Sequence, residues 1–552
     1  MADQNSQINP ARRWLPRFDA WSVGAAIIAM LVLMPIASVL WIALHPSENI
    51  WPHLLSTTLP RYFGNTVLLA GCVGLIAALV GSVTAWMVTM YRFPGVTVLQ
   101  WLLLLPLAIP AYVGAYALVD FLEYAGPVQT ALRDSFGWQT SKDYWFPEIR
   151  SRWAAIVVMS AALTPYVFLL SRAAYREQSA SIYEVARALG AGPVRRFWSV
   201  GFPMARPAIA AGTAIVMMET VSEFGVVEFF AVQTLTTGIF SVWLQSGNAG
   251  GAAQIAGVIL MLILVLVALE KTSRRRSRFH GLGRQIRPID PIALTGWRGG
   301  LALAICALPF VIGFVMPVTV ILTHALQHPD YWVDPGLARA FVHTLTVGGS
   351  AAVITVGAAL FMVYGVRLSQ ARLPRHLLPL TTIGYAAPGA VLGVGLLIPM
   401  AAADNAIADA VEVWTGVDIG LLMTGSAFAI VYAYAVRFFA IAQGATDAAM
   451  GRVSPSLSMA ARSLGRSAGG TLRAVYVPLI RGSVGTALLL VFVDCVKELP
   501  ATLLLRPFNY NTLSTRIYEK ASLEQIGQAA PAAVLVILVG MSAVALLARN
   551  NR

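Results

Sequence analysis

Five acidic side chains lie at the ends of two apolar segments that are long enough to cross a bilayer. They are Glu219, Glu223 and Glu228 in one segment, and Asp494 and Glu498 in the other. A charged side chain is costly inside a membrane, so such residues generally face protein or water and mark the route of a solute. Carboxylate oxygens are also the ligands that hard cations prefer. These residues therefore indicate a candidate path for a cation.

Two of these acids occupy equivalent places, because Glu223 and Glu498 are 275 positions apart in segments that resemble each other. Each is followed by a pair of residues that interrupts a helix and suits a gate. These pairs are Phe224-Gly225 and Leu499-Pro500. Conduction requires release as well as binding, so we expect no tightly bound metal. We predict that the path is formed by Glu223, Glu498, Leu499, Pro500 and Thr502.

A different interpretation of the acidic residues is structural. They would then form ion pairs with basic side chains nearby or cap the ends of helices. The candidate basic partners are Lys497, Arg506 and Arg516.

A polar segment between two apolar runs, which we call the first elbow, extends from Ser181 to Pro203. Its pattern predicts a short helix, a tight turn and a second short helix. Ser181 and Glu184 have the spacing of a capping box, and Gly190 suits the left-handed residue that ends a helix. Pro203 is expected to break the chain before it re-enters the membrane. Small residues such as Ala186 permit close approach by another protein surface.

A second elbow repeats this pattern from Ser456 to Pro478 and keeps Gly465 at the position that matches Gly190. It departs from the first elbow at Met459, which replaces the acidic Glu184. An amphipathic helix lying on lipid would also explain one such segment. Its recurrence at the same place in both halves of the chain favours a surface that receives another protein.

The composition requires a membrane protein to carry these elements. Of the 552 residues 57% are hydrophobic and only 12% are charged, whereas soluble domains have about 25% charged residues. This excludes a secreted disulfide scaffold, a disordered chain and a typical cytosolic enzyme. The net charge is +13. In a membrane protein the positions of Lys and Arg are more informative than their sum, because both residues are enriched in cytoplasmic loops.

A bilayer core of about 30 Å needs roughly 20 apolar residues in a helix. Such runs predict twelve spans, at residues 21–44, 64–90, 97–120, 153–171, 205–227, 252–270, 300–323, 342–366, 378–401, 420–442, 480–496 and 530–548. Most of the 39 Lys and Arg residues, with Arg437 among them, then fall in alternate loops. This bias predicts that both termini are cytoplasmic.

The chain also repeats itself. Leu59-Pro-Arg-Tyr-Phe63 with Thr66 recurs as Leu337-Ala-Arg-Ala-Phe341 with Thr344, and Thr234-Leu-Thr-Thr237 recurs as Thr512-Leu-Ser-Thr515. Six spans in each half would make the two repeats parallel. We therefore predict an all-α membrane protein with two pseudo-symmetric halves. Its parts are a cytoplasmic segment at 1–20, a first half at 21–270, a basic linker at 271–298 and a second half at 299–549.

Several chemistries have no signature in the chain. It holds no G-x-x-x-x-G-K-[ST] phosphate loop, and its three cysteines and seven histidines are scattered without ligand spacing. We therefore expect no catalytic residue, no cofactor and no nucleic acid.

The two elbows resemble the E-A-A…G loop of ABC importer permeases, the membrane subunits of binding-protein-dependent uptake systems. The match is Glu184-Val-Ala…Leu-Gly190 in the first half and Met459-Ala-Ala…Leu-Gly465 in the second. In that family the loop forms a coupling helix that sits in a groove of the ATPase subunit. The resemblance implies coupling roles for Glu184, Ala186, Leu189, Gly190, Pro203, Ala461, Leu464, Gly465 and Pro478.

The fused halves and the segment from Glu498 to Tyr518 are similar to the ferric-iron type of these permeases. This resemblance implies two cytoplasmic ATPase subunits, which bind ATP and Mg²⁺, and a soluble binding protein outside a bacterial inner membrane. Relatives of this type carry thiamine, polyamines or phosphonates, so these substrates stay open. Two further alternatives are an ion-coupled secondary carrier, which shares the twelve-span plan, and a membrane-embedded enzyme that uses the acidic residues.

Overall fold

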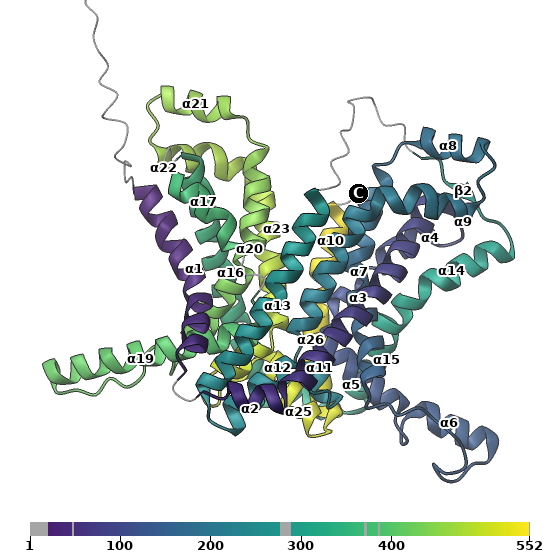
Figure 1. Ribbon diagram of the computed structural model, residues 1–552, viewed down its shortest axis with the longest axis horizontal. Helices are drawn as coiled ribbons and strands as arrows, with labels where there is room; N and C mark the ends of the chain where they lie inside the picture. The colour runs from purple at the N-terminus through teal and green to yellow at the C-terminus, as the bar shows by residue number, and fades with distance from the viewer. Residues whose placement is uncertain are drawn as a thin grey trace, which may run out of the picture.

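The computed structural model describes residues 20–46, 49–275, 289–368, 372–382, 384 and 387–550, and these residues are predominantly helical. Eleven of the described helices are long and apolar enough to cross a membrane, or up to twelve if one bent pair counts as a single span. The predicted all-α, polytopic architecture is therefore confirmed. Figure 1 shows that most of the long helices run between two faces of the molecule.

The first half contains the following elements. They are α1 (Ala20–Leu44), α2 (Trp51–Ser56), α3 (Leu59–Met90), β1 (Tyr91–Arg92), α4 (Val96–Leu102), η2 (Leu105–Ala108), α5 (Ala111–Leu122), α6 (Pro127–Phe136), α7 (Arg152–Arg176), α8 (Ala180–Ala188), α9 (Pro193–Arg196), η3 (Phe197–Gly201), α10 (Phe202–Ser222), α11 (Gly225–Phe229), α12 (Leu235–Phe240), η4 (Ser241–Gln245) and α13 (Ala249–Arg275).

The second half begins after β2 (Ile292–Ala293). Its elements are α14 (Trp297–Phe310), η5 (Val311–Val315), α15 (Met316–Gln327), η6 (Pro329–Val333), α16 (Pro335–Leu368), α17 (Arg372–Thr381), α19 (Gly389–Thr415), α20 (Phe428–Gly451), α21 (Pro455–Ser463), α22 (Ala468–Thr471), η7 (Leu472–Tyr476), α23 (Val477–Lys497), α24 (Pro500–Leu505), α25 (Leu513–Ser522) and α26 (Ile526–Asn550).

The two halves repeat the order of their long helices and elbows, because α3, α7, α8, α10, α12 and α13 of the first half correspond to α16, α20, α21, α23, α25 and α26 of the second. The repeat extends to single hydrogen bonds. Thr66 Oγ1 accepts from the Leu235 amide at 3.0 Å, and Thr344 Oγ1 accepts from the Leu513 amide at 2.8 Å. Thr234 and Thr512 each cap a helix with a reciprocal capping box. The recurring Thr-Leu-x-Thr motif is therefore a structural device that attaches α12 to α3 and α25 to α16.

Two predicted spans are not single straight helices. Residues 97–120 form a bent pair, with α4 and η2 inclined by 95° to α5 and α6. Pro110 lacks an amide hydrogen and disfavours the helical conformation at Ile109, which is extended with φ −103° and ψ 126°. The span predicted at 378–401 is also interrupted, because α17 ends at Thr381 and α19 begins at Gly389 after Pro388.

Pro203 and Pro478 do not break the chain, contrary to our prediction. Both lie inside long helical segments, Pro193–Ser222 and Ala468–Lys497, that are continuous enough to count as spans. Each proline is preceded by a stretch of π-helix, η3 or η7. The wider turn accommodates a residue that cannot donate an amide hydrogen bond, so the helix continues.

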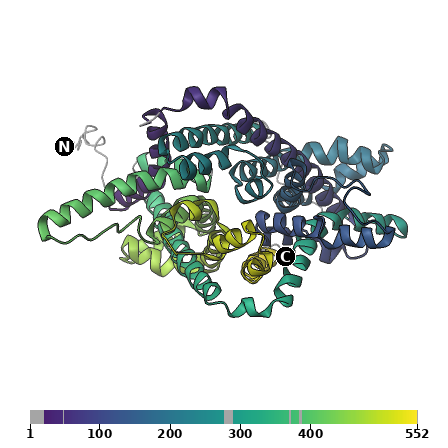
Figure 2. The same cartoon turned by 90° about the horizontal axis from the view of Figure 1, so that it is seen from below.

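The first long helix of each half packs against the other half. Helix α1 contacts α16, α17 and α19 of the second half as well as α13 of the first, and α14 contacts α3 and α4 of the first half. Trp21 of α1 stacks on Phe361 of α16, with ring centroids 4.7 Å apart. Figure 2 shows α1 beside the green helices of the second half. The halves are therefore interlocked.

The linker between the halves also makes a defined contact. Strands β1 and β2 pair in parallel, with Tyr91 opposite Ile292, and the Leu294 amide donates to the Arg92 carbonyl at 2.8 Å. This strap holds the start of the second half against the end of α3, beside the first elbow.

Candidate functional site

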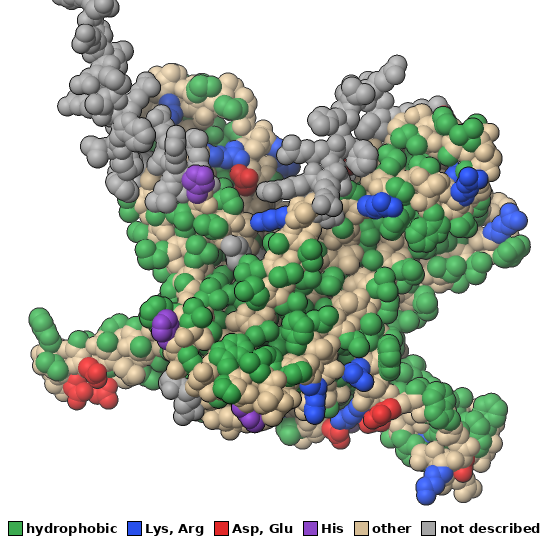
Figure 3. Space-filling view, viewed as in Figure 1, with side chains coloured by type: hydrophobic (Ala, Val, Ile, Leu, Met, Phe, Trp, Pro, Cys, Tyr) green, Lys and Arg blue, Asp and Glu red, His purple; other side chains and the backbone are tan. Residues whose placement is uncertain are grey.

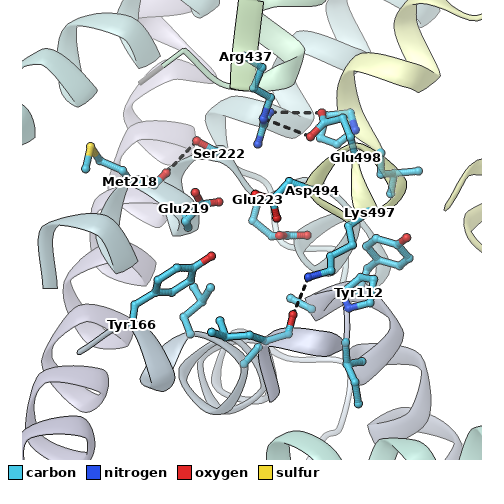
Figure 4. A pocket seen from close by; sticks show the side chains of 18 of the residues that line it. Tyr112, Tyr166, Met218, Glu219, Ser222, Glu223, Arg437, Asp494, Lys497 and Glu498 are labelled. Carbon is cyan, nitrogen blue, oxygen red and sulfur yellow. Dashed lines mark hydrogen bonds and ion pairs between the residues drawn. The ribbon is translucent and has the colours of Figure 1, made fainter. Parts of the chain in front are cut away.

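A cavity of about 160 Å³ lies between the two halves, and its lining combines charged and aromatic side chains with aliphatic ones (Figure 4). Four of the lining residues are acidic and two are basic. The acids are Glu219, Glu223, Asp494 and Glu498, and the bases are Arg437 and Lys497. Tyr112 and Tyr166 of the first half also line the cavity.

The acids form two repeat pairs, because Glu219 and Asp494 have the same separation as Glu223 and Glu498. Glu223 follows the last residue of α10, and Glu498 follows the last residue of α23. The Oε1 atom of Glu223 accepts from the Val226 amide at 3.1 Å, and that of Glu498 accepts from the Ala501 amide at 3.1 Å. Each carboxylate therefore stabilises the start of a short helix, α11 or α24.

The backbone at these two glutamates is held in the same way. The Glu223 carbonyl accepts from the Thr236 hydroxyl at 2.7 Å, and the Glu498 carbonyl accepts from the Ser514 hydroxyl at 2.8 Å. The chain breaks after α10 and α23 are therefore held by defined hydrogen bonds, and the backbone carbonyls at these breaks have partners within the protein.

Glu498 also has a cationic partner that the sequence analysis did not identify. Arg437 of α20 lies 3.2 Å from Glu498 through Nε and Oε2, and 3.2 Å through Nη1 and Oε1. We had counted Arg437 among the basic residues of a loop, which is wrong. The sequence signal that could have identified Arg437 is that it is a single arginine within an otherwise apolar segment.

The predicted basic partners have other roles. Lys497 donates to the backbone oxygen of Leu107 in the first half at 2.6 Å, and Arg506 pairs with Glu519 at 2.5 Å. Arg516 pairs with Asp334. Arg506 and Arg516 therefore pair with acids other than the five that the structural interpretation considered, whereas Glu223 and Glu498 do stabilise helix starts, as that interpretation also proposed. Capping does not exclude a path, because both side chains also face the cavity.

The other predicted path residues divide into two groups. Leu499 and Pro500 line the cavity with the two glutamates. Thr502 is absent from the lining and fully buried; its hydroxyl lies 2.5 Å from that of Tyr434. Glu228 is exposed on α11. Of the five predicted path residues, all except Thr502 therefore line the cavity. Their role in transport stays a prediction.

Among the described residues, His, Cys, Asp and Glu side chains form no group of three or more that is arranged to hold a metal ion.

The elbows form helical hairpins on one face of the molecule (Figure 1). Gly190 follows α8 with φ +77°, and Gly465 follows α21 with φ +82°. The Ala191 amide donates to the Ala186 carbonyl, and the Arg466 amide donates to the Ala461 carbonyl. This is the Schellman pattern, which requires the left-handed conformation that glycine adopts without strain. The predicted glycine-terminated helices are confirmed.

The predicted capping box of the first elbow is wrong. Helix α8 begins at Ala180, with Ser179 as the N-cap and no capping bond from its side chain. The Ser179 hydroxyl lies 2.9 Å from that of Ser181, which is already inside the helix.

The tips of the elbows expose large apolar side chains (Figure 3). Leu189 is 80% exposed and its repeat mate Leu464 is 84% exposed. Glu184 is exposed, whereas Ala461 is buried under its elbow. Exposed leucines at matching places are unusual on a free polar surface and fit a surface that another protein covers.

Two interlocked sets of apolar helices, a charged cavity between them and paired elbows on one face define a multi-pass membrane permease. Residues 71–278 match the family of binding-protein-dependent transport system inner membrane components. The first half therefore contains a region that matches this family, and the relatives described next extend the similarity over both halves.

The relatives show both the fused and the single-half form. The Fe(3+)-transport system permease protein FbpB 2 of Haemophilus influenzae is 25% identical over 88% of this chain and 89% of its own length. The ferric transport system permease protein FbpB of Actinobacillus pleuropneumoniae is 22% identical over 87% of this chain and 70% of its own length. The sulfate transport system permease protein CysT of Escherichia coli is 28% identical over 48% of this chain and 95% of its own length.

Proposed function

We propose that this permease imports ferric iron. The observation that carries the proposal is the chemistry of the cavity, in which four carboxylates face two basic side chains. A hard trivalent cation favours such oxygen ligands, whereas an oxyanion such as sulfate would favour basic groups and amides. The relatives that span most of the chain are ferric permeases, which agrees with this choice.

Transport is driven by two ATPase subunits that dock on the elbows. The exposed tips at Leu189 and Leu464 support this assignment. Closure of the ATPase dimer on ATP and Mg²⁺ moves the elbows, and the rigid segments Pro193–Ser222 and Ala468–Lys497 transmit that motion to the ends of α10 and α23. The cavity then opens alternately to the two sides, and this chain itself carries no catalytic step.

The elbow face is cytoplasmic in this proposal, and α1 begins and α26 ends on the same face (Figure 1). A soluble binding protein delivers the iron to the opposite face. There the α6 hairpin and the far end of α19 project from the bundle.

The test is uptake of labelled iron by proteoliposomes. They contain the permease with the ATPase that co-purifies from its native membrane, and the binding protein is added outside. We expect uptake that requires ATP and is not reduced by excess sulfate, thiamine or polyamine. Uptake without the ATPase would instead establish an ion-coupled carrier, and competition by one of the other solutes would identify a different substrate.

A further inference from the structure

The cavity is symmetric in its acids but not in its bases. Arg437 is 275 positions after Ala162, the separation that relates Glu223 to Glu498, and both Ala162 and Arg437 line the cavity. Lys497 likewise corresponds to Ser222. The second half therefore supplies both cations, and Arg437 forms an ion pair with Glu498, whereas Ala162, at the equivalent position of the first half, carries no charge.

The backbone beside Glu498 is adapted to this arginine. Gly389 begins α19 after Pro388, and its counterpart in the first half is Ala111, which begins α5 after Pro110. A methyl group on Gly389 would collide with Glu498 Oε1, Arg437 Nη1 and the Ala501 amide. The ion pair thus occupies the space that a side chain takes in the first half.

We propose that Arg437 is a resident counter-cation of the path, which occupies Glu498 while the cavity is empty and yields it to a passing cation. The inference rests on the proposed function, because it describes how the site treats a cation. It assigns Arg437 as a positioning residue that acts through Glu498.

The physical reason is the burial of the pair. Glu498 is 5% exposed, and a buried carboxylate without a counter-charge is strongly unfavourable. A guanidinium keeps its charge at every physiological pH and can contact both carboxylate oxygens. A cation that reaches Glu498 must therefore compete with Arg437, which weakens binding and favours release.

The assignment is tested by binding of Tb³⁺, a hard trivalent probe, to the purified permease in nanodiscs, followed by tyrosine-sensitised luminescence. We expect Arg437→Gln to bind Tb³⁺ about tenfold more tightly than the unaltered protein, because the competing charge is gone. The double variant Arg437→Gln/Glu498→Gln should lose this gain. Equal affinity of Arg437→Gln and the unaltered protein, with both monodisperse, would overturn the proposal.

Two further variants separate the ion pair from general charge. Lys497→Gln removes the same charge from the cavity but leaves the pair of Arg437 and Glu498 intact, so its gain should be clearly smaller. An equal gain would show that net charge alone matters and would refute the role of the pair. Gly389→Ala keeps both charges but forces the pair apart, so it should also increase Tb³⁺ affinity, and no increase would count against the proposal.

Transport kinetics separate this inference from the proposed function. In Arg437→Gln proteoliposomes we expect iron uptake to saturate at a lower iron concentration and a lower maximal rate, because binding is tighter and release slower. Arg437→Lys should restore most of the rate. The unaltered complex could transport no iron while the variants still show the expected differences in Tb³⁺ affinity. That result would refute ferric iron as the substrate but would support the role of Arg437 as a counter-cation.

Discussion

At the scale of single residues, the two repeat-related glutamates have the same backbone role and different electrostatic surroundings. Glu223 and Glu498 each accept a hydrogen bond of 3.1 Å from an amide at the start of a short helix, and Glu498 in addition forms an ion pair with Arg437. Their equivalence in the sequence thus does not extend to their energetics, and the two should respond differently to the same substitution.

We predict that Glu498→Gln destabilises the protein more than Glu223→Gln. Loss of Glu498 leaves the Arg437 charge without its buried partner, which costs about 3–5 kcal/mol, whereas Glu223→Gln weakens a cap by about 1 kcal/mol. Thermal unfolding in detergent should show the larger decrease in Tm for Glu498→Gln. The double variant Arg437→Met/Glu498→Met should recover much of the loss, and equal Tm values for the two single variants would contradict the assigned ion pair.

At the scale of elements, the elbows depend on one backbone conformation each. Gly190 and Gly465 have positive φ, and a Cβ atom at either position would meet nothing within 4 Å. A larger residue at either position is therefore disfavoured by the backbone conformation and not by a steric clash with neighbouring residues. Substitutions at these positions thus test the geometry of the elbow directly.

We predict that Gly190→Val and Gly465→Val each reduce ATP-dependent uptake and the amount of ATPase that co-purifies. The left-handed conformation costs a residue with a side chain roughly 1–2 kcal/mol, so the last turn of α8 or α21 should unwind and displace the exposed leucine before it. Gly192→Val and Gly469→Val are matched controls, because these glycines lie in the same elbows with open space and without positive φ. Normal uptake with normal ATPase docking in Gly190→Val and Gly465→Val would refute the coupling role.

The strap formed by β1 and β2 is a second element that can be tested. Leu294→Pro removes the amide that donates to Arg92, at a cost of about 1 kcal/mol, and should increase hydrogen exchange at Tyr91 and in α8. Leu294→Ala keeps the amide and serves as the control. Unchanged exchange in the proline variant would show that the strap does not restrain the first elbow.

At the scale of the whole molecule, the halves are held together by exchange of their first helices. Helix α1 packs on α16, α17 and α19, and α14 packs on α3 and α4. Polar contacts also cross between the halves, including Arg150 to Glu524 at 2.8 Å and His324 to Asp120 at 2.9 Å. Association should therefore not require a continuous chain.

We predict that residues 1–280 and 281–552, produced as two chains, assemble and co-purify from membranes. A first chain that begins at residue 49 lacks α1 and should retain much less of the second chain, since the contacts of α1 with α16, α17 and α19 are lost. Equal recovery with and without α1 would show that these contacts contribute little to assembly.

Much of this architecture follows from local patterns. Apolar runs of bilayer length predict most spans, because a backbone in lipid must satisfy its own hydrogen bonds as helix. Gly190 and Gly465 end their helices as predicted, because that conformation is a property of the residue. Glu223 and Glu498 follow equivalent helices, as their repeat spacing indicates, and both line the cavity, while their role in a path stays a prediction.

The features that local patterns do not contain depend on distant parts of the chain. Pro203 and Pro478 continue their helices because a π-turn precedes each of them, whereas Pro110 stands at a sharp bend. Arg437 enters the cavity because α20 packs beside α23 and places it next to Glu498. Helix α1 lies against α13 of its own half and against α16, α17 and α19 of the other, a contact that forms only when the two halves pack. A residue's type and near neighbours specify its conformation, but its partners depend on which surfaces meet when the helices pack.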